Sequence, residues 1–284
     1  MINSSIPSIQ ALEFLKTLYL FGKSDIPAAV LPSMVVSFVL TDPSLYSVSS
    51  ALTAFLWIAA HLLAFDVKNQ MLGIPEDKIS KPDRPLPSGR ISLQDAGLLY
   101  AILFCLMWAI SVYTGTEPCT LFYTIAILVY NEGGLARIAM FKNVLGGFGM
   151  SCYCWGGASV LGQTQSLNTP KSLAIFIFGA VFATTGHAQD FRDIKADAHM
   201  QRRTIPLLLT RAAARWSLAF LIMAWTTGLL LLWCPPRLVA GLFGGVAVSC
   251  AGWYLLSRGE EDDYWGYVWY GVSTSFAFFV RVTG

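Results

Sequence analysis

Charged side chains are scarce in this sequence. Asp, Glu, Lys and Arg make up 13% of the 284 residues, about half of their share in a soluble domain, whereas 55% of the residues are hydrophobic. Histidine occurs only three times, and the formal net charge of +2 gives no reason to expect a nucleic-acid partner. The composition excludes an ordinary soluble domain and predicts an integral membrane protein, with one polytopic domain over residues 1–284.

A secretory leader and a disulfide framework are also lacking. The first residues, MINSSIPSIQALEFLKTLYLF, show neither a basic leader nor a small-residue cleavage site, so no cleavable signal peptide is expected. The six cysteines lie mostly inside apolar segments. Cys152 and Cys154 are two positions apart in an expected helix and therefore point in different directions, which argues against a metal pair. We interpret all six as small packing residues.

Long apolar runs dominate instead. A bilayer core requires about 20 apolar residues per helix. Nine segments are candidates, at about 26–41, 49–71, 93–114, 118–134, 143–163, 170–190, 212–233, 236–256 and 264–282. Because a backbone in lipid must satisfy its own hydrogen bonds, an all-α bundle of nine transmembrane helices is predicted. Within the N-terminal segment 1–25, residues 8–22 are expected to form an amphipathic helix on the membrane surface.

The positive charges divide unevenly between the two sides of such a bundle. Lys171, Arg237 and Arg281 fall on one side, and the other sixteen of the 19 Lys and Arg residues fall on the opposite side. The positive-inside rule then places the N-terminus and the two longest loops, 66–92 and 187–206, in the cytosol. We expect a protein of the endoplasmic reticulum membrane whose active site faces the cytosol.

The second of these loops carries an acidic motif, DFRDIKAD. Its spacing predicts that Asp190, Asp193 and Asp197 lie on one helical face, where three like charges repel unless a cation offsets them. Mg²⁺ binds one or two carboxylates and completes its shell with water and phosphate oxygens. Arg202 and Arg203 follow and suit the same phosphate. A charged, solvated helix end is the alternative interpretation, but charged clusters at a membrane edge favour function.

The first loop repeats this pattern in altered form. Gln70, Gly73 and Asp77 have the spacing of three and four found in the second motif, which suggests a weak internal duplication. Pro75 predicts that the helix kinks or ends nearby. The following KPDRPLPSGR is expected to form an extended basic strap that carries Lys81, Arg84 and Arg90. A loop that meets anionic lipid is the alternative.

Together these motifs resemble the UbiA family of membrane prenyltransferases. That family has nine transmembrane helices around a cavity, with NDxxDxxxD and an RPxPSG-like stretch after helix two and DxxDxxxD after helix six. Here DxxDxxxD matches fully, RPLPSG stands at 84–89, and the first motif matches at Asn69 and Asp77. The resemblance implies Mg²⁺ held by Asp190, Asp193, Asp197, Asp77 and Glu76, of which the four aspartates are also the expected catalytic residues. It implies diphosphate binding by Asn69, Gln70, Lys81, Arg84, Arg202, Arg203 and, from the basic 130–143 stretch, Lys142.

The departures from the family pattern bear on the reaction. Gln70 and Gly73 replace two aspartates, and such a first motif resembles the fungal branch that cyclises its prenyl diphosphate. We therefore expect a terpene cyclase acting on farnesyl diphosphate. A prenyltransferase with an aromatic or quinone-type acceptor is the alternative. A transporter or lipid-binding protein is disfavoured because the charges gather at one end of the spans rather than along them.

A cyclase must hold its cation in a dry cavity that offers aromatic faces. The candidates on spans two, four and five are Trp57, His61, Phe65, Tyr130, Phe148, Tyr153 and Trp155. Simple packing within the bundle is the alternative interpretation of each and the more common role of such residues. His61 is the one histidine in the middle of a span, and it is interpreted either as the final base or as a hydrogen-bonded core residue.

Overall fold

A computed structural model describes residues 7–163 and 168–279, and it confirms the all-α prediction. The N-terminal segment 1–25 and the last predicted span, 264–282, each extend beyond the described residues. The α-helices are α1 (Pro7–Gly22), α2 (Leu31–Leu40), α3 (Val48–Leu72), α4 (Ile74–Ser80), α5 (Leu93–Thr114), α6 (Glu117–Asn131), α7 (Ala139–Leu161), α8 (Thr169–Thr185), α9 (Ile194–His199), α10 (Ile205–Leu208), α11 (Arg211–Trp233), α12 (Arg237–Leu256) and α13 (Glu260–Phe279).

Not all of these helices suit a bilayer by themselves. Within the described ranges, six helical stretches are long and apolar enough to cross a membrane, and they include α3, α5, α7, α11, α12 and a stretch from Thr169 to His199 that begins with α8. A helix overlaps each of the nine predicted ranges, but α6 has only 15 residues and α2 only 10. The predicted number of nine transmembrane helices is therefore not confirmed.

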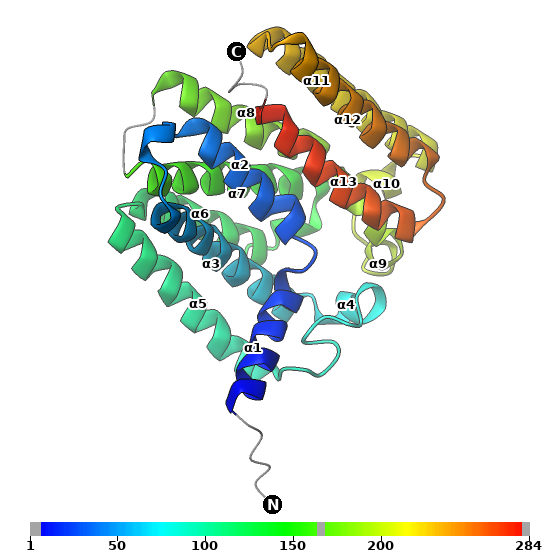
Figure 1. Ribbon diagram of the computed structural model, residues 1–284. Helices are drawn as coiled ribbons and strands as arrows, with labels where there is room; N and C mark the ends of the chain where they lie inside the picture. The colour runs from blue at the N-terminus through cyan, green and yellow to red at the C-terminus, as the bar shows by residue number, and fades with distance from the viewer. Residues whose placement is uncertain (1–6, 164–167, 280–284) are drawn as a thin grey trace, which may run out of the picture.

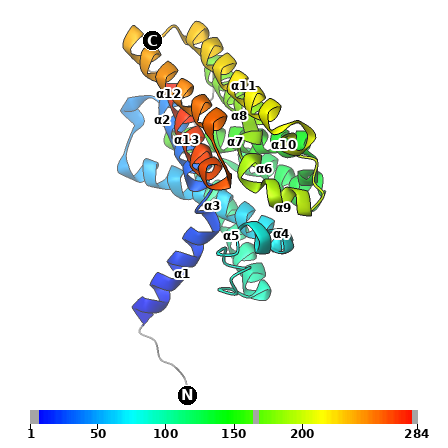
Figure 2. The same cartoon turned by 90° about the vertical axis from the view of Figure 1, so that its right-hand side faces the viewer.

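The chain bends sharply near its N-terminus. A π-helical turn, Ile26–Val30, leads into α2, and the axis turns by 64° between Ala11–Gly22 and Ile26–Leu40. The bent pair would count as a seventh span if it crosses the membrane as one unit. The helix predicted over 8–22 is confirmed as α1, which projects away from the bundle (Figures 1 and 2). Its position on the membrane surface stays a prediction.

Helix α7 lies at the centre of the bundle and packs against α2, α3, α6 and α8 (Figure 1). Glycines make this close packing possible. A side chain at Gly147 would overlap the backbone of Gly179 on α8, and one at Gly156 would overlap the ring of Trp57 on α3. Small residues of this kind let membrane helices approach one another closely. Farther along, α11 pairs with α12, and α13 closes the bundle against α2 and α12.

The two loops predicted to be functional lie next to each other, because α4 packs against α9 (Figure 2). Helix α3 ends at Leu72, and Pro75 lies in the first turn of α4, which confirms the predicted break. The predicted extended strap over 81–90 is wrong. Successive turns form there instead, such as the bond from the Ser88 N–H to the Arg84 carbonyl at 3.0 Å, and Gly89 takes the left-handed conformation with φ of +72°.

The second acidic motif also differs from the prediction of one continuous helical face. Helix α8 ends at Thr185, 3₁₀ turns cover Gly186–Ala188 and Asp190–Asp193, and α9 begins only at Ile194. Residues three apart still face the same side of a 3₁₀ turn, so Asp190 and Asp193 stay neighbours. Asp197 belongs to a separate helix. A spacing of three residues fits both an α-helix and a 3₁₀ helix, so the sequence did not show which of the two forms here.

Candidate active site

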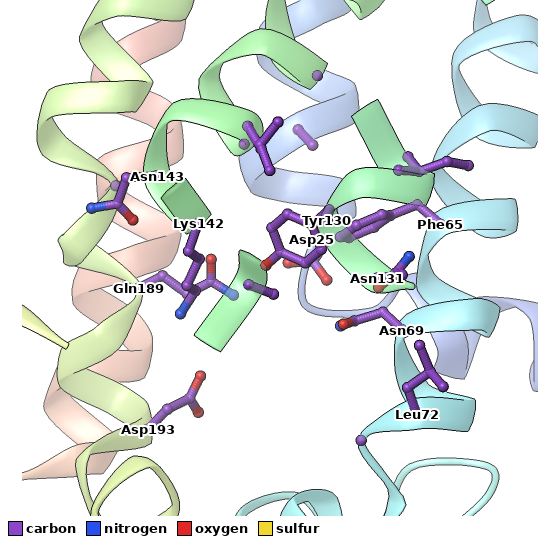
Figure 3. A pocket seen from close by; sticks show the side chains of 18 of the residues that line it. Asp25, Phe65, Asn69, Leu72, Tyr130, Asn131, Lys142, Asn143, Gln189 and Asp193 are labelled. Carbon is purple, nitrogen blue, oxygen red and sulfur yellow. The ribbon is translucent and has the colours of Figure 1, made fainter. Parts of the chain in front are cut away.

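A cavity of about 880 Å³ opens between α3, α4, α6, α7 and the segment after α8. Figure 3 shows Lys142 and Asp193 on one side of it and Asn69 and Leu72 on the other. Its lining has two chemical characters. Most of the charged lining comes from both loops and from the start of α7, with Glu76, Asp77, Lys81, Arg84, Lys142, Asp193 and Arg202; Asp25, Glu132 and Arg137 are the other charged residues. The apolar and aromatic lining comes from the helices, and it includes Leu62, Phe65, Tyr123, Ile127, Met150, Tyr153, Phe182 and Tyr270.

Each carboxylate of the second motif contacts a different basic side chain. Lys142 Nζ lies 2.6 Å from Asp190 Oδ1, and Lys81 Nζ lies 2.9 Å from Asp193 Oδ2. Arg202 Nη1 lies 3.3 Å from Asp197 Oδ1. All three carboxylates are buried, but only Asp193 lines the cavity; the other two sit behind its wall. The motif therefore forms a charged layer with basic residues drawn from three separate elements.

The first motif joins the same layer from α3 and α4. Asn69 and both acidic residues, Glu76 and Asp77, line the cavity. Arg84 Nη1 donates to both oxygens of Asp77 at 2.9 Å, and Arg202 Nη1 donates to Glu76 at 3.0 Å. Because Arg202 contacts both Glu76 and Asp197, it bridges the two motifs. The pair of Lys81 with Asp193 forms a second bridge between the loops.

The charged form of Lys81 would be stabilised by an additional anion, whereas Arg84 is already stabilised by carboxylates. Burial lowers the pKa of Lys81 below that of a free lysine, and the nearby Arg192 and Arg84 lower it further against the attraction of Asp193. Burial also opposes the charged form of Arg84, but the carboxylates around it, with Asp77 first, raise its pKa overall. A phosphate group placed beside Lys81 would offset the cost of burying its charge by accepting charge-assisted hydrogen bonds.

Two predicted diphosphate ligands lie elsewhere. Gln70 is buried and does not line the cavity; its amide donates to the Phe21 carbonyl at 2.8 Å and so ties α3 to α1. Arg203 is exposed and also lies outside the lining, while its backbone pairs with Ile138 in an isolated bridge. The structure thus places Gln70 in the packing between α3 and α1, and it places Arg203 at the surface outside the cavity lining.

Three of the predicted aromatic wall residues line the cavity. Phe65 and Tyr130 meet edge to face with ring centroids 5.2 Å apart, and Tyr153 shares a short hydroxyl contact of 2.5 Å with Tyr123. The Tyr123 hydroxyl in turn donates to the His61 carbonyl at 3.0 Å. Phe65, Tyr130 and Tyr153 thus line the cavity, and the Tyr153 hydroxyl is hydrogen-bonded within the protein.

The other wall candidates lie outside the cavity lining. Trp57 is fully buried behind the wall, where it stacks on His61 at 3.7 Å and donates to Ser111 at 2.8 Å. The His61 ring bonds the Trp57 carbonyl and Thr120, which favours the core interpretation over the final base. Neither residue lines the cavity, and the same holds for Phe148, which is exposed, and Trp155, which packs beside Phe122.

The structure adds cavity residues that the sequence did not single out. Asp25 lies at the break between α1 and α2, and Figure 3 shows it beneath Tyr130 in the view into the cavity. Asn143, Gln189 and Arg137 also line the cavity. Gln189 directly precedes Asp190, Asn143 directly follows Lys142, and Arg137 lies in the same basic stretch. Their closeness in sequence to predicted site residues is the feature that could have identified them. Asp25 belongs to no motif.

The acidic residues of the two motifs provide the type of ligand atom that binds Mg²⁺. Asp190 Oδ2 and Asp197 Oδ2 are buried without a hydrogen-bond partner, and carboxylate oxygens are the ligands that Mg²⁺ prefers. Among the described residues, no three His, Cys, Asp or Glu side chains gather closely enough to enclose a metal ion by themselves. The arrangement therefore fits an ion held by one or two carboxylates, with water and phosphate oxygens as its remaining ligands.

Comparison with known proteins decides the family. Residues 29–273 match the model of the UbiA prenyltransferase family. The chain belongs to this family. Fumagillin beta-trans-bergamotene synthase af520 from Aspergillus fumigatus is 54% identical over 260 residues, which cover 92% of this chain and 89% of that protein. The predicted resemblance to the fungal terpene-forming branch of UbiA is thereby confirmed.

A further relative and a solved structure are also similar to this chain. Polyprenyl transferase eriF from Hericium erinaceus is 28% identical over 213 residues, covering 72% of each chain. The structure of a UbiA homolog from Archaeoglobus fulgidus bound to GPP and Mg²⁺ superposes with a TM-score of 0.64 at 16% identity, covering 94% of this chain and 99% of that one. At this identity the superposition shows the UbiA fold alone.

Proposed function

We propose that this protein is a membrane terpene cyclase that ionises farnesyl diphosphate with the help of Mg²⁺ and closes the resulting cation on itself. The observation that carries the proposal is the cavity, whose charged part draws on both acidic loops and whose remaining lining is apolar and aromatic. The bergamotene synthase relative supports cyclisation, and the GPP and Mg²⁺ bound to the archaeal homolog support the substrate class and the metal.

In this proposal, the basic lining residues bind the diphosphate. Lys142, Lys81, Arg84 and Arg202 release part of their contact with the carboxylates and donate to phosphate oxygens, with Asn69 beside them. The proposed Mg²⁺ ligands are Asp193, Asp77 and Glu76 in the cavity lining and Asp190 and Asp197 behind it, with one or two carboxylates for each ion. The metal supplies positive charge that neutralises the leaving diphosphate. Because cross-loop ion pairs already hold Lys81 and Arg202 at the cavity, these donors are oriented before the substrate binds.

The aromatic part of the cavity then governs the fate of the cation. The electron pair of the broken C–O bond leaves with diphosphate, and an alkene of the same chain attacks the allylic cation. Phe65, Tyr130 and Tyr153 offer ring faces that stabilise positive charge. Their setting among Leu62, Ile127 and Met150 keeps water from the cation. Transfer of a proton from the cyclic cation to the released diphosphate ends the reaction.

A prenyltransferase is the second candidate. The polyprenyl transferase relative favours it, because it is similar over 72% of this chain. Such an enzyme shares the ionisation chemistry but needs an acceptor molecule in the cavity. The two functions therefore differ in whether diphosphate is released without an acceptor.

Product analysis separates them. Purified protein in nanodiscs is incubated with farnesyl diphosphate and Mg²⁺, with and without a panel of phenolic and quinone-precursor acceptors; parallel reactions contain geranyl or geranylgeranyl diphosphate, or EDTA. We expect a cyclic hydrocarbon or alcohol from farnesyl diphosphate without acceptor, and no product with EDTA. Prenylated acceptor as the sole product, with no diphosphate released in its absence, would show that the protein is a prenyltransferase.

A further inference from the structure

A second, smaller cavity of about 270 Å³ adjoins the first. Lys81, Arg84 and Asp193 line both cavities, so the two spaces meet at these side chains. The smaller one is bounded by the end of α1, the turns after α4, the 3₁₀ turn Asp190–Asp193 and the start of α13. It lies on the loop side of the bundle, and none of the aromatic residues of the main cavity lines it.

Arg192 is the unusual residue of this cavity. Its side chain is only 3% exposed, yet Nε, Nη1 and Nη2 all lack a hydrogen-bond partner. The nearest carboxylates are at ion-pair rather than hydrogen-bond distance, with Asp25 Oδ1 at 3.8 Å and Asp193 Oδ2 at 3.7 Å. The guanidinium stacks 4.3 Å above the ring of Tyr267. Buried donors left without acceptors are costly, and a fixed guanidinium with free donors is suited to an oxyanion.

Three of the four acidic residues around this cavity are engaged with other cations, and the fourth, Glu261, is exposed. Asp193 contacts Lys81, Asp83 contacts Lys23 at 3.5 Å, and Glu260 contacts Lys195 at 2.9 Å. Arg84 faces the cavity from the junction with the main site, where it donates to Asp77. Three buried or half-buried cations, Lys81, Arg84 and Arg192, thus surround a space in which Arg192 alone keeps all of its side-chain donors unbonded.

We propose that the smaller cavity binds a phosphate or diphosphate group through Arg192, with Lys81 and Arg84 shared with the main site. Its occupant is the diphosphate released by the cyclisation reaction, an identification that rests on the proposed function. Lys81 and Arg84 contact the anion in both cavities, so it can move from the main cavity into the smaller one. The diphosphate then leaves on the loop side of the bundle without passing the aromatic lining. A phosphate headgroup of a membrane lipid has the same chemistry and is the other source of such a ligand.

Direct binding tests the site without turnover. Detergent-purified protein is titrated with inorganic diphosphate in EDTA by calorimetry, and with a short-chain phosphatidate in a parallel experiment. We expect the Arg192→Gln variant to bind diphosphate about tenfold more weakly or worse, and Arg192→Lys to lie between it and the unaltered protein. Lys78→Gln is the matched control, because it removes one positive charge from an exposed position on α4. Thermal unfolding verifies that each variant is folded.

The outcomes separate this proposal from the proposed function. Equal diphosphate affinity in folded Arg192→Gln and in the unaltered protein would overturn the site. Arg192-dependent binding of phosphatidate but not of diphosphate would assign the oxyanion site to lipid and overturn the product route. If diphosphate binding depends on Arg192 while farnesyl diphosphate is not converted, the site stands and the proposed function fails. In an active enzyme, Arg192→Gln should also raise the inhibition constant of added diphosphate several-fold.

Discussion

Lys142 Nζ lies 2.6 Å from Asp190 Oδ1, and the two side chains form a buried ion pair between α7 and the 3₁₀ turn after α8. Sequence separation between them is 48 residues. The second oxygen of Asp190 has no hydrogen-bond partner, so this lysine provides the charge compensation for a carboxylate that is fully buried. The pair joins the central helix of the bundle to the acidic motif.

Removal of Lys142 should therefore destabilise the fold. In Lys142→Met the Asp190 carboxylate stays buried without its cation, and we expect a loss of about 3–5 kcal/mol in the free energy of unfolding. The double variant Lys142→Met/Asp190→Leu should recover most of that loss and remain inactive. Reversible unfolding in detergent measures both. Equal stability of the single and double variants would show that the pair does not couple the two elements.

The catalytic prediction concerns Asp193, the one carboxylate of the second motif that lines the main cavity. If it serves the metal-bound diphosphate, Asp193→Asn should lower kcat by about a thousandfold, which corresponds to about 4 kcal/mol of barrier. Asp95→Asn, an exposed carboxylate at the start of α5, is the control and should keep full activity. The measurement is the release of diphosphate at saturating Mg²⁺. Near-normal turnover in folded Asp193→Asn would remove this residue from the site.

Local chemistry explains which parts of this arrangement were predictable. Pro75 and the long apolar runs act within their own segment, so the end of α3 and most helices follow from the sequence. The spacing of Asp190 and Asp193 located the site but did not reveal the 3₁₀ turn, because a repeat of three suits both helix types. The positions of Asp25 and Gln70 depend on contacts with segments that are distant in the sequence. No local pattern therefore shows that Asp25 lines the cavity whereas Gln70 packs between helices.

The buried position of Trp57 gives a prediction about packing. Because Gly156 on α7 lies directly against the ring of Trp57, Gly156→Ala must displace that ring or separate the helices. We expect a loss of about 1–3 kcal/mol in the free energy of unfolding. Gly244→Ala on α12, where a side chain would meet nothing within 4 Å, should cause no loss. A shift in the thermal midpoint for Gly156→Ala alone would confirm the contact, and equal midpoints for both variants would contradict it.

Tyr153 allows the role of an aromatic face to be separated from that of a hydroxyl. Its hydroxyl contacts that of Tyr123, and Tyr123 already donates to the His61 carbonyl, so the Tyr153 hydroxyl is the donor to Tyr123. Removing it in Tyr153→Phe leaves the Tyr123 donor satisfied and keeps the ring that lines the cavity. If the ring face stabilises the cation, Tyr153→Phe should give the same product profile as the unaltered enzyme.

Tyr153→Leu removes the face but retains an apolar side chain, and the loss of a cation–π contact of about 0.5–2 kcal/mol should shift the product ratio several-fold. We expect acyclic alkenes and alcohols to increase at the expense of the cyclic product, because the allylic cation then loses its proton or meets water before ring closure. Gas chromatography of the products from farnesyl diphosphate measures the ratio. An equally altered profile in Tyr153→Phe and Tyr153→Leu would assign the effect to the hydroxyl, which both variants lack, instead of the ring.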